Sequence, residues 1–381
     1  MKIKDICTSV TDGSHNPPQG IEKSEYMMLS SKNIFDDEIT FDEPRFLSEK
    51  DFEREHKRTQ IAVGDVLLTI VGTVGRTAVV DEDMPAFALQ RSVAVLHPKN
   101  DVCLPRFLMY ALRGKRTYIE NRAKGVAQKG IYLKEVSDID IYIPDISNQE
   151  IIINKLDKVN TIIKLRQEEL LALDNLIKAR FVELFECGDH EIVKASDVCD
   201  FITKGTTPPT GEITEEYENG KIPFLKVYNL SFTGEMLFDE NPQYILAETH
   251  NGKLARSKVY PNDVLMNIVG PPLVTDEFEE WNINQAIAIF RAKERILPRF
   301  LLHALMQPKV LEPFIGQAVG IRQQNLSLEQ CRNLQFPLPS LEEQKSFVEF
   351  AEQLDKSKVA VQKALDETQM LFDSLMQEYF G

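Results

Sequence analysis

The chain has 381 residues, of which 43% are hydrophobic and 27% charged, and its formal net charge is −15. This length suits two or more domains, and the composition is that of a globular protein rather than a disordered or membrane-embedded one. No apolar run approaches the roughly 20 residues that a membrane helix needs, no signal peptide opens the chain, and the five cysteines are scattered without a CxxC pair. We therefore expect a cytoplasmic protein with reduced thiols and no metal site.

Short strand-like runs open the chain and are separated by Gly, Pro, Asn and Asp. They cover residues 26–29, 66–71, 77–80 and 92–96. Such runs predict a mixed or antiparallel sheet with long loops. An amphipathic helix then begins at Pro105, a Gly-containing loop covers residues 125–130, and a last strand is predicted at 139–143.

A heptad repeat follows this first globular part. Apolar residues recur every seventh position at Leu156, Ile163, Leu170, Ile177 and Leu184, and no Pro or Gly interrupts the run. The pattern predicts a long helix that packs lengthwise against another helix. We expect Ser147 to cap its start together with Glu150, and Gly188 to end it.

The sequence repeats itself after this helix. Leu104-Pro105-Arg106-Phe107-Leu108 returns 193 residues later as Leu297-Pro298-Arg299-Phe300-Leu301, and Asp65-Val66-Leu67 returns as Asp263-Val264-Leu265. A second capping box, Ser340 with Glu343, opens a second long helix with a stripe of Phe347, Leu354, Val361 and Leu375 that Thr368 interrupts. Residues 30–60 and 210–258 match poorly. The order of the matches predicts two related domains that differ mainly in their loops.

The predicted fold is α+β, with two tandem-related mixed α/β domains separated by two long antiparallel helices in a coiled coil, related by a pseudo-two-fold axis. The first domain covers residues 1–145 and its long helix 146–187. The second domain covers 188–338 and the C-terminal helix 339–381. The helices pair through Leu156, Ile163, Leu170, Ile177, Leu184, Phe347, Leu354, Val361 and Leu365.

Positive charge is concentrated in one stretch of this acidic chain. Between Leu104 and Lys134 eight basic residues stand against Glu120 alone, a net charge of +7. A solvated helix face explains such a run, and so does a local patch that binds phosphate, because binding depends on the local field rather than on net charge.

Sequence motifs of common active sites are missing. The chain has no GxxxxGK[ST], GxGxxG, HExxH or GxSxG pattern, and its six histidines share no metal-ligand spacing. Asn16-Pro17-Pro18-Gln19 is similar to the [DN]PP[YFW] motif of amino-methyltransferases. Gln19 replaces the aromatic residue that would stack on a base, and we interpret the segment as a loop fixed by proline.

Polar loops recur at matching places in both halves and are the candidates for contacts with DNA. Gly72-Thr73-Val74-Gly75-Arg76 is either a hairpin turn or a backbone site for phosphate. Gln90-Arg91, Gln128-Lys129, Asn284-Gln285 and Arg322-Gln323-Gln324 carry amide and guanidinium donors. Such groups pair with adenine and guanine in the major groove.

Taken together, these residues resemble the DNA-specificity (S) subunit of type I restriction–modification systems over nearly the whole chain. The resemblance rests on the GDVLL, VGTVGR and LQRSVAVL segments of the first half, on NDVLM and NINQAIAIF of the second, and on both helix starts. Pro271-Pro272 departs from the Thr73-Val74-Gly75 of the first half, so a phosphate contact there is not carried over. The resemblance implies one half-site of a split DNA target for each domain.

We predict DNA contacts in both domains from these patterns. In the first domain they are Gly13, Ser14, Lys32, Asn33, Gly72, Thr73, Arg76, Gln90, Arg91, Arg122, Lys124, Gln128, Lys129 and Tyr132. In the second they are Lys204, Gly205, Thr206, Lys226, Tyr228, Asn229, Asn284, Gln285, Arg322, Gln323 and Gln324.

The resemblance also implies the partners of the chain. They are double-stranded DNA, the modification (methyltransferase) subunits and, through the complex, a restriction/translocase subunit, with no membrane contact. This chain is then non-catalytic and binds no cofactor; S-adenosylmethionine, ATP and Mg belong to the partner subunits. Two alternatives stay open, a stand-alone methyltransferase or nuclease with a fused reader, and a pure coiled-coil scaffold.

Overall fold

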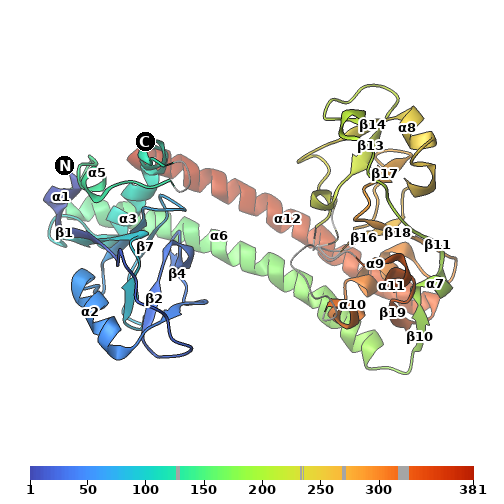
Figure 1. Ribbon diagram of the computed structural model, residues 1–381, viewed down its shortest axis with the longest axis horizontal. Helices are drawn as coiled ribbons and strands as arrows, with labels where there is room; N and C mark the ends of the chain where they lie inside the picture. Colours follow the sequence, from blue (N-terminus) through green and yellow to red (C-terminus); the bar gives the residue numbers. More distant parts are fainter. Residues whose placement is uncertain (126–128, 232–233, 235, 268–271, 316–325) are drawn as a thin grey trace. The chain divides into compact units, whose positions relative to one another are not determined.

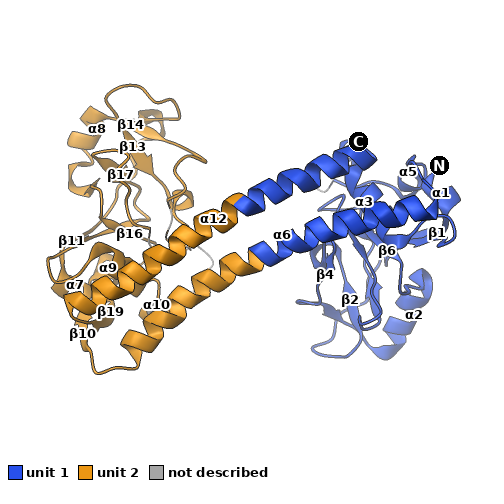
Figure 2. Ribbon diagram, turned by 180° about the vertical axis from the view of Figure 1, so that it is seen from behind, with its two compact units in different colours: residues 1–166, 364–381 blue, residues 167–363 orange. Residues whose placement is uncertain are grey.

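The computed structural model describes residues 1–125, 129–231, 234, 236–267, 272–315 and 326–381 (Figure 1). The chain forms two compact units (Figure 2). Unit 1 consists of Met1–Arg166 and Ala364–Gly381, and unit 2 of Gln167–Lys363. Each unit therefore contains its own globular part and a segment of both long helices.

The elements of unit 1 precede and include the first half of the long helix α6 (Ile146–Phe181). In chain order they are α1 (Ile3–Ile6), β1 (Cys7–Asp12), β2 (Met27–Leu29), η1 (Ser31–Asn33), β3 (Ile34–Phe35), β4 (Glu38–Ile39), β5 (Arg45–Phe46), α2 (Glu49–Thr59), β6 (Val66–Thr69), β7 (Thr77–Val79), β8 (Phe87–Leu89), β9 (Val93–Pro98), α3 (Pro105–Gly114), α4 (Arg116–Arg122) and α5 (Leu133–Ser137).

Unit 2 repeats much of this order and ends in the long helix α12 (Leu341–Phe380), whose last part belongs to unit 1. Its elements are η2, a π-helical turn (Val182–Glu186), β10 (Glu191–Lys194), α7 (Ala195–Val198), β11 (Cys199–Lys204), η3 (Thr210–Glu212), β12 (Ile213–Thr214), β13 (Lys221–Leu225), η4 (Val227–Asn229), β14 (Tyr244–Leu246), α8 (Ala247–Asn251), η5 (Ala255–Ser257), β15 (Lys258–Val259), β16 (Val264–Met266), β17 (Trp281–Ile283), β18 (Ala288–Ala292), α9 (Pro298–Leu305), α10 (Pro308–Ile315), α11 (Leu328–Arg332) and β19 (Gln335–Leu338).

The strand order of the sheets confirms that the two units have related folds. In unit 1 an antiparallel sheet has the order β1-β9-β6-β7, and the three strands β11-β18-β16 form its counterpart in unit 2. Both edge strands start with an irregular register, between Cys7 and Ser9 and between Cys199 and Phe201. A parallel pair, β2 with β8 or β13 with β17, lies in the second sheet of each unit.

A buried glutamine fixes the start of each long helix and extends the duplication to single side chains. The Gln149 Oε1 atom accepts the Leu104 N–H at 2.8 Å, and its Nε2 donates to the carbonyls of Val102 and Pro144. Gln344 makes the same three bonds, with Leu297 N–H and the carbonyls of Arg295 and Pro339. Both side chains are fully buried, so each satisfies backbone groups that water does not reach.

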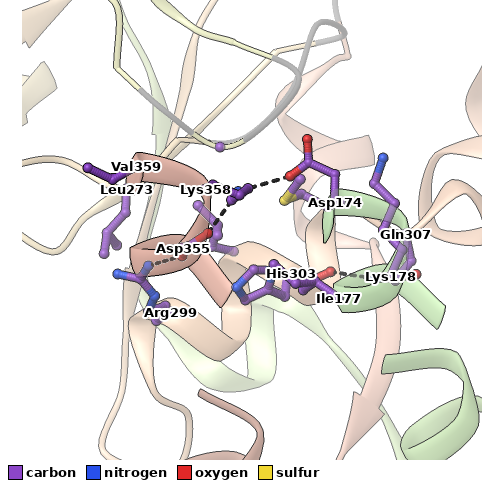
Figure 3. A pocket seen from close by; sticks show the side chains of 13 residues that line it. Asp174, Ile177, Lys178, Leu273, Arg299, His303, Gln307, Asp355, Lys358 and Val359 are labelled. Atoms are coloured by element: carbon purple, nitrogen blue, oxygen red, sulfur yellow. Dashed lines mark hydrogen bonds and ion pairs between the residues drawn. The ribbon is translucent and has the colours of Figure 1, made fainter. Parts of the chain in front are cut away.

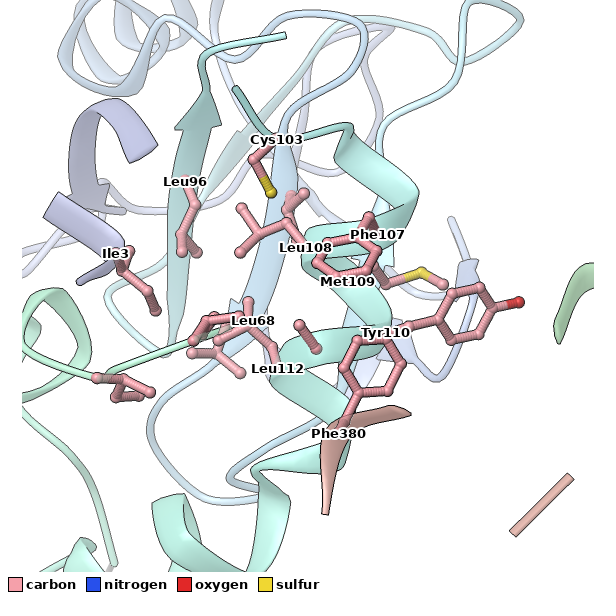
Figure 4. Packing of buried hydrophobic residues seen from close by; sticks show 14 of the residues in the cluster. Ile3, Leu68, Leu96, Cys103, Phe107, Leu108, Met109, Tyr110, Leu112 and Phe380 are labelled. Carbon is pink, nitrogen blue, oxygen red and sulfur yellow. The ribbon is translucent and has the colours of Figure 1, made fainter. Parts of the chain in front are cut away.

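The core of unit 1 lies between the antiparallel sheet and the helices. Figure 4 shows Leu68 and Leu96 of the sheet packed against residues of α3, with Phe380 of α12 on the other side of that helix. The rings of Phe107 and Phe380 lie edge to face, 5.3 Å apart. Gly114 permits this approach, because a Cβ atom there would lie 2.5 Å from Cβ of Phe380. The C-terminal helix segment is thus part of the unit 1 core.

The caps of the two long helices differ in one respect from the expectation. Ser340 and Glu343 form the predicted capping box before α12. At α6 the expectation of Ser147 as cap is wrong, because the helix begins at Ile146 and the Asp145 carboxylate accepts the Asn148 N–H at 2.9 Å. An ionised Asp is also favoured by the helix dipole at this end.

Within each unit the segments of α6 and α12 run antiparallel. In unit 1 Lys155 Nζ donates to Tyr379 Oη at 3.0 Å, and Arg166, further along α6, donates to Thr368, which is earlier on α12. In unit 2 Lys358 pairs with Asp174 at 2.9 Å, and the rings of Phe181 and Phe347 lie 5.5 Å apart. Each pairing contains apolar and charged contacts.

The heptad positions are buried to different extents. Leu156, Ile163, Ile177 and Phe347 are buried, whereas Leu170, Leu184, Leu354, Val361 and Leu365 are partly exposed. Phe372 and Phe380, which the heptad count omits, are buried in the unit 1 core. None of the helices in the described ranges is long and apolar enough to span a membrane.

Candidate nucleic-acid interface

Hydrogen bonds join the ends of β1 and β8 in unit 1. The Ser14 N–H donates to the Leu89 carbonyl at 2.7 Å, and Ser14 forms an isolated parallel bridge with Gln90. Gly13 is required here because a Cβ atom would lie 2.1 Å from the Leu89 oxygen. The predicted sites Gly13, Ser14, Gln90 and Arg91 therefore lie together, with Gly13 and Ser14 buried and Arg91 exposed.

The β6–β7 hairpin adds a second group of predicted residues to the same loop cluster. The Gly72 N–H donates to the Lys129 carbonyl at 3.1 Å, and Thr73 Oγ1 donates to the Ser31 carbonyl at 3.4 Å. Ser31 N–H in turn donates to Ser92 Oγ at 3.0 Å, next to Arg91. Gly72 has a φ of +84°, which only glycine adopts without strain.

These contacts define the unit 1 loop cluster, made of residues 13–14, 31–33, 72–76, 90–92 and 129–132. Several of its polar and basic side chains reach solvent, namely Lys32, Thr73, Arg91, Lys129 and Tyr132, with Arg122 and Lys124 exposed in the adjoining segment. Tyr132 is 71% exposed. Arg122 stacks over the Tyr118 ring at 4.4 Å. Lys32 lies 3.8 Å from Glu43 in an exposed pair, which is weak in water.

Two predicted contacts are buried turn residues. Asn33 accepts the Ser30 N–H at 3.1 Å and donates to the Asp42 carbonyl at 2.9 Å. Asn229 accepts the Lys226 N–H at 2.9 Å and donates to the Leu237 carbonyl at 3.2 Å. They are 2% and 0% exposed, so these amides stabilise the loops that carry their exposed neighbours.

Three arginines of the basic run lie in internal ion pairs. Arg106 contacts Asp157 and Asp37, and the Tyr110 hydroxyl donates to Asp157 at 2.6 Å. Arg116 pairs with Asp36 and donates to the Gly75 carbonyl, and Arg113 lies 3.7 Å from Asp36. The net charge of +7 counted between Leu104 and Lys134 is therefore not a free surface charge. That count omitted Asp36 and Asp37, which lie outside the stretch and form ion pairs with these arginines.

Arg76 is held in the same region. Its guanidinium lies 4.9 Å above the centre of the Phe35 ring and donates to the Ile34 carbonyl at 3.4 Å. Because Arg76 follows the Gly72–Gly75 turn, this packing orients the hairpin from its inner side. The exposed part of the hairpin is therefore its turn, where Gly72 and Thr73 are exposed to solvent.

Unit 2 has a corresponding loop cluster made of residues 205–207, 226–229 and 284–286. Gly205 repeats the close approach of Gly13, since a Cβ atom would lie 2.2 Å from the Asn284 oxygen. The Asn284 N–H donates to the Leu225 carbonyl at 3.0 Å, and the Gln285 N–H to Thr207 Oγ1 at 3.5 Å. Gln285 and Tyr228 are exposed. Burial, followed by the charge of Glu215, raises the pKa of the Tyr228 hydroxyl, which stays a neutral donor.

Three basic residues complete the description of this cluster. Arg256 donates to Thr206 Oγ1 at 3.3 Å and is exposed. Sequence reasoning missed it because its stretch has no recognisable counterpart in the first half. Lys204 donates to the Leu326 carbonyl at 2.8 Å, and Lys226 is partly exposed. Gln128, Arg322, Gln323 and Gln324, also predicted contacts, lie outside the described residues.

Chemically, both clusters offer hydroxyl, amide, guanidinium and ammonium groups on short turns. In the part of the chain that the structure describes, no group of three His, Cys, Asp or Glu side chains is placed to hold a metal ion. The Asn16–Gln19 segment is a loop in which the Pro18 carbonyl accepts a hydrogen bond from Arg45 at 2.7 Å. Such turns contact polyanions through positioned donors.

Comparison with known proteins gives the family. Residues 1–175 and 188–368 match the family described as the type I restriction modification DNA specificity domain. The chain belongs to this family. Its two matched segments correspond to the two halves of the duplication, and the sequence resemblance is confirmed.

Named relatives and solved structures are consistent with this family. The chain is 26% identical to the Type I restriction enzyme EcoBI specificity subunit of Escherichia coli, over 47% of this chain and 38% of that protein. It is 24% identical to the Type I restriction enzyme MjaVIII specificity subunit of Methanocaldococcus jannaschii, over 72% of this chain and 71% of that protein. The chain thus spans well under half the length of the first relative.

The fold is shared with solved structures at low identity. One, described as the structural basis underlying complex assembly and conformational transition of the type I R-M system, has a TM-score of 0.57 and 18% identity, covering 100% of this chain and 96% of that one. The S subunit of the type I restriction-modification system from M. genitalium has a TM-score of 0.50 and 14% identity, and the match covers 100% of this chain and 95% of that chain.

Proposed function

We propose that this chain is the DNA-specificity subunit of a type I restriction–modification complex and reads one half of a bipartite DNA target with each unit. The observation that carries the proposal is the duplicated loop cluster, which presents exposed polar and basic side chains at corresponding strand ends in both units. Family membership supplies the biological setting. The four-segment division, with recognition domains 1–145 and 188–338 and helices 146–187 and 339–381, is part of the proposal.

Different residues have different tasks in this proposal. Arg91, Arg122 and Lys129 contact phosphates and position the duplex, because they are exposed basic groups. Gln90 follows β8 and Gln285 follows β17, and both side chains contact base edges, where amide side chains pair with adenine. Gln128 and Arg322–Gln324, outside the described residues, complete the sequence-based set. The buried Asn33 and Asn229 support the loops instead.

Modification subunits dock, in this proposal, on the long helices. Within unit 1 the helix residues Ile151, Ile162, Leu165 and Met370 are 41–63% exposed, and within unit 2 Leu171, Leu176 and Val359 are 47–70% exposed. Exposed apolar rows of this kind support a protein partner. Catalysis then belongs to the partners, with S-adenosylmethionine in the modification subunits and ATP and Mg in the restriction/translocase subunit, all in the cytoplasm.

The long helices also set the spacing of the half-sites in this proposal. Helix α6 has 36 residues and is continuous from unit 1 into unit 2, which corresponds to a length of about 54 Å. Insertion of four residues, about one helical turn, into both α6 and α12 is expected to lengthen the gap between half-sites and leave their sequences unchanged. Unchanged spacing would remove this role.

Footprinting on the complex reconstituted with its modification subunits tests the proposed function. We expect two protected segments separated by an unprotected spacer, and a stronger salt dependence than for a Lys129→Ala complex. A stand-alone methyltransferase or nuclease would instead act without partners, and no residue of the described chain favours it. Absence of sequence-specific protection in the assembled complex would contradict the proposal.

A further inference from the structure

Arg58, near the end of α2, joins this helix to the end of β1. Its Nη2 atom donates to Asp12 Oδ1 at 3.0 Å, and its Nε atom donates to the Asp12 carbonyl at 3.3 Å. Asp12 is buried, and its Oδ2 atom lies 2.7 Å from Nε2 of His15. The Arg58 side chain is 46% exposed. A buried carboxylate thus holds one edge of an exposed guanidinium group.

This arginine lies beside the unit 1 loop cluster. Asp12 ends β1 two residues before Ser14, whose carbonyl accepts the Arg91 N–H at 2.9 Å. Ser14 also forms the parallel bridge with Gln90, the proposed contact with a base edge. The bonds of Arg58 therefore end next to the point where these loops meet, although none of the predicted contacts belongs to α2.

Unit 2 has an arginine at the corresponding point. Arg58 and Arg256 each stand seven residues before an aspartate, Asp65 or Asp263, whose carboxylate accepts the N–H of the third residue before it. Arg256 Nη2 donates to Thr206 Oγ1 at 3.3 Å, on the turn that follows β11. Helix α2 and the turn η5, which carry the two arginines, have unlike sequences. Both units nevertheless direct an arginine to the turn that follows β1 or β11.

The two arginines differ in the last residue of the strand beside them. β1 ends with Asp12, and β11 ends with Lys204, which donates to the Leu326 carbonyl at 2.8 Å. This strand position therefore carries a carboxylate in unit 1 and an ammonium group in unit 2. The carboxylate fixes the orientation of Arg58 and offsets its charge, so Arg58 adds little to any long-range attraction of DNA.

Two other arginine–aspartate pairs of the chain join helices instead. Arg299 of α9 pairs with Asp355 of α12, and Figure 3 shows its guanidinium directed at that carboxylate. Arg106 of α3 uses Nε and Nη2 on Asp157 and Nη1 on Asp37, so all three nitrogens are engaged. Arg58 uses only Nε and Nη2 among the described residues. Its outer end, Nη1 with the second N–H of Nη2, faces away from Asp12.

We propose that Arg58 recognises a guanine in the DNA half-site of unit 1 and that Asp12 is its positioning residue. This inference rests on the proposed function. The outer end of the guanidinium matches the O6 and N7 acceptors that guanine presents in the major groove. A base edge is the partner rather than a phosphate, because the Asp12 carboxylate beside Arg58 would repel a phosphate group.

Competition binding to the assembled complex tests this assignment. The duplexes carry the methylated motif with one base pair changed at a time. For the wild type, replacement of the guanine that Arg58 contacts should weaken binding by about 5- to 150-fold. Arg58→Ala and Arg58→Lys should both lose this one discrimination and keep the others. The lysine restores the charge and the ion pair with Asp12 but not the planar guanidinium, so it separates base recognition from a structural role.

Two further variants complete the experiment. Asp12→Asn should lower discrimination at the same base pair and strengthen binding to unrelated DNA, because a negative charge is removed from the interface. A purely structural role of Asp12 would not confine the loss to one base pair. Arg54→Ala is the matched control, since this exposed arginine of α2 pairs with Asp51 and Glu55. It should leave every discrimination unchanged.

The outcomes separate this inference from the proposed function. If the wild-type complex shows no two-part sequence preference, the proposed function fails and the assignment of Arg58 fails with it. If the preference is present and Arg58→Ala or Arg58→Lys keeps the discrimination of the wild type at every base pair, only the assignment is overturned. A lost discrimination at an A·T pair would overturn it as well.

Discussion

Replacement of His303 by Phe gives a sharp test of the unit 2 packing. The imidazole lies under α12 with its ring 5.3 Å from that of Phe347. Its pKa falls to about 4 in the folded chain, against an ordinary value of 6.5. Between these two pH values His303 binds a proton in the unfolded chain but not in the folded chain, so the free energy of unfolding falls as pH falls from 6.5 towards 4.

The difference of two to three pH units corresponds to about 3 kcal/mol of stability, at about 1.4 kcal/mol for each unit. The wild type should lose this amount below pH 6.5 in addition to the losses from its carboxylates. His303→Phe should lose only the latter. At pH 8 the two proteins should differ little, because the buried Nε2 atom of His303 has no hydrogen-bond partner to lose and Phe preserves the contact with Phe347.

Urea unfolding followed by Trp281 fluorescence, from pH 4 to 8 in carboxylate-free buffers, measures this difference. His190→Gln is the matched control, since it removes a partly exposed histidine from the same unit. Its curve should follow that of the wild type. Parallel pH dependence of the wild type and His303→Phe would refute the reasoning, because it would mean that His303 takes up its proton without cost.

Three further predictions follow from individual contacts. Gln149→Leu leaves one N–H and two carbonyls without partners and should destabilise unit 1 by about 3 kcal/mol. Gln344→Leu should destabilise unit 2 by a similar amount. A neutral effect of either substitution in denaturant melts would show that water replaces the amide. The hydrogen bond to Asp65 raises the pKa of His97, so this pair stabilises the fold fully below pH 6.5 and the gain disappears as pH rises through the raised pKa; His97→Gln should therefore cost more at pH 5.5 than at pH 9 in thermal melts. Lys129→Ala should weaken binding of the assembled complex to all DNA sequences and lower the slope of log K against log salt by about 0.9, and a sequence-selective loss would instead assign Lys129 to a base.

The duplication, the two long helices and the Ser340 capping box were predictable because their signals are local or repeat in order. The first helix start was not, since Asp145 and Ser147 are both good caps and their relative strength depends on the carboxylate geometry. The similarity of the loop segments was also hidden. Asn33 and Asn229 form equivalent turns although the surrounding sequences share little.

The candidate site was predictable as a set of loops but not residue by residue. The sequence alone does not tell which polar loop residues stabilise the turn and which are exposed to solvent. Lys32 and Asn33 are neighbours, yet Lys32 is exposed and Asn33 is buried. Charge counting along the chain failed for a related reason. Arg106 and Arg116 are neutralised by Asp37 and Asp36, about 70 and 80 positions away, and only the fold brings them together.

Methylome sequencing of a host that expresses the complex tests the central claim most directly. With the wild-type chain we expect a methylated motif made of two specific halves separated by a fixed unspecific spacer. Gln90→Ala should relax one half only, and Gln285→Ala the other half only. A continuous motif, or a loss of specificity in both halves from either substitution, would contradict the account of two separate readers on one chain.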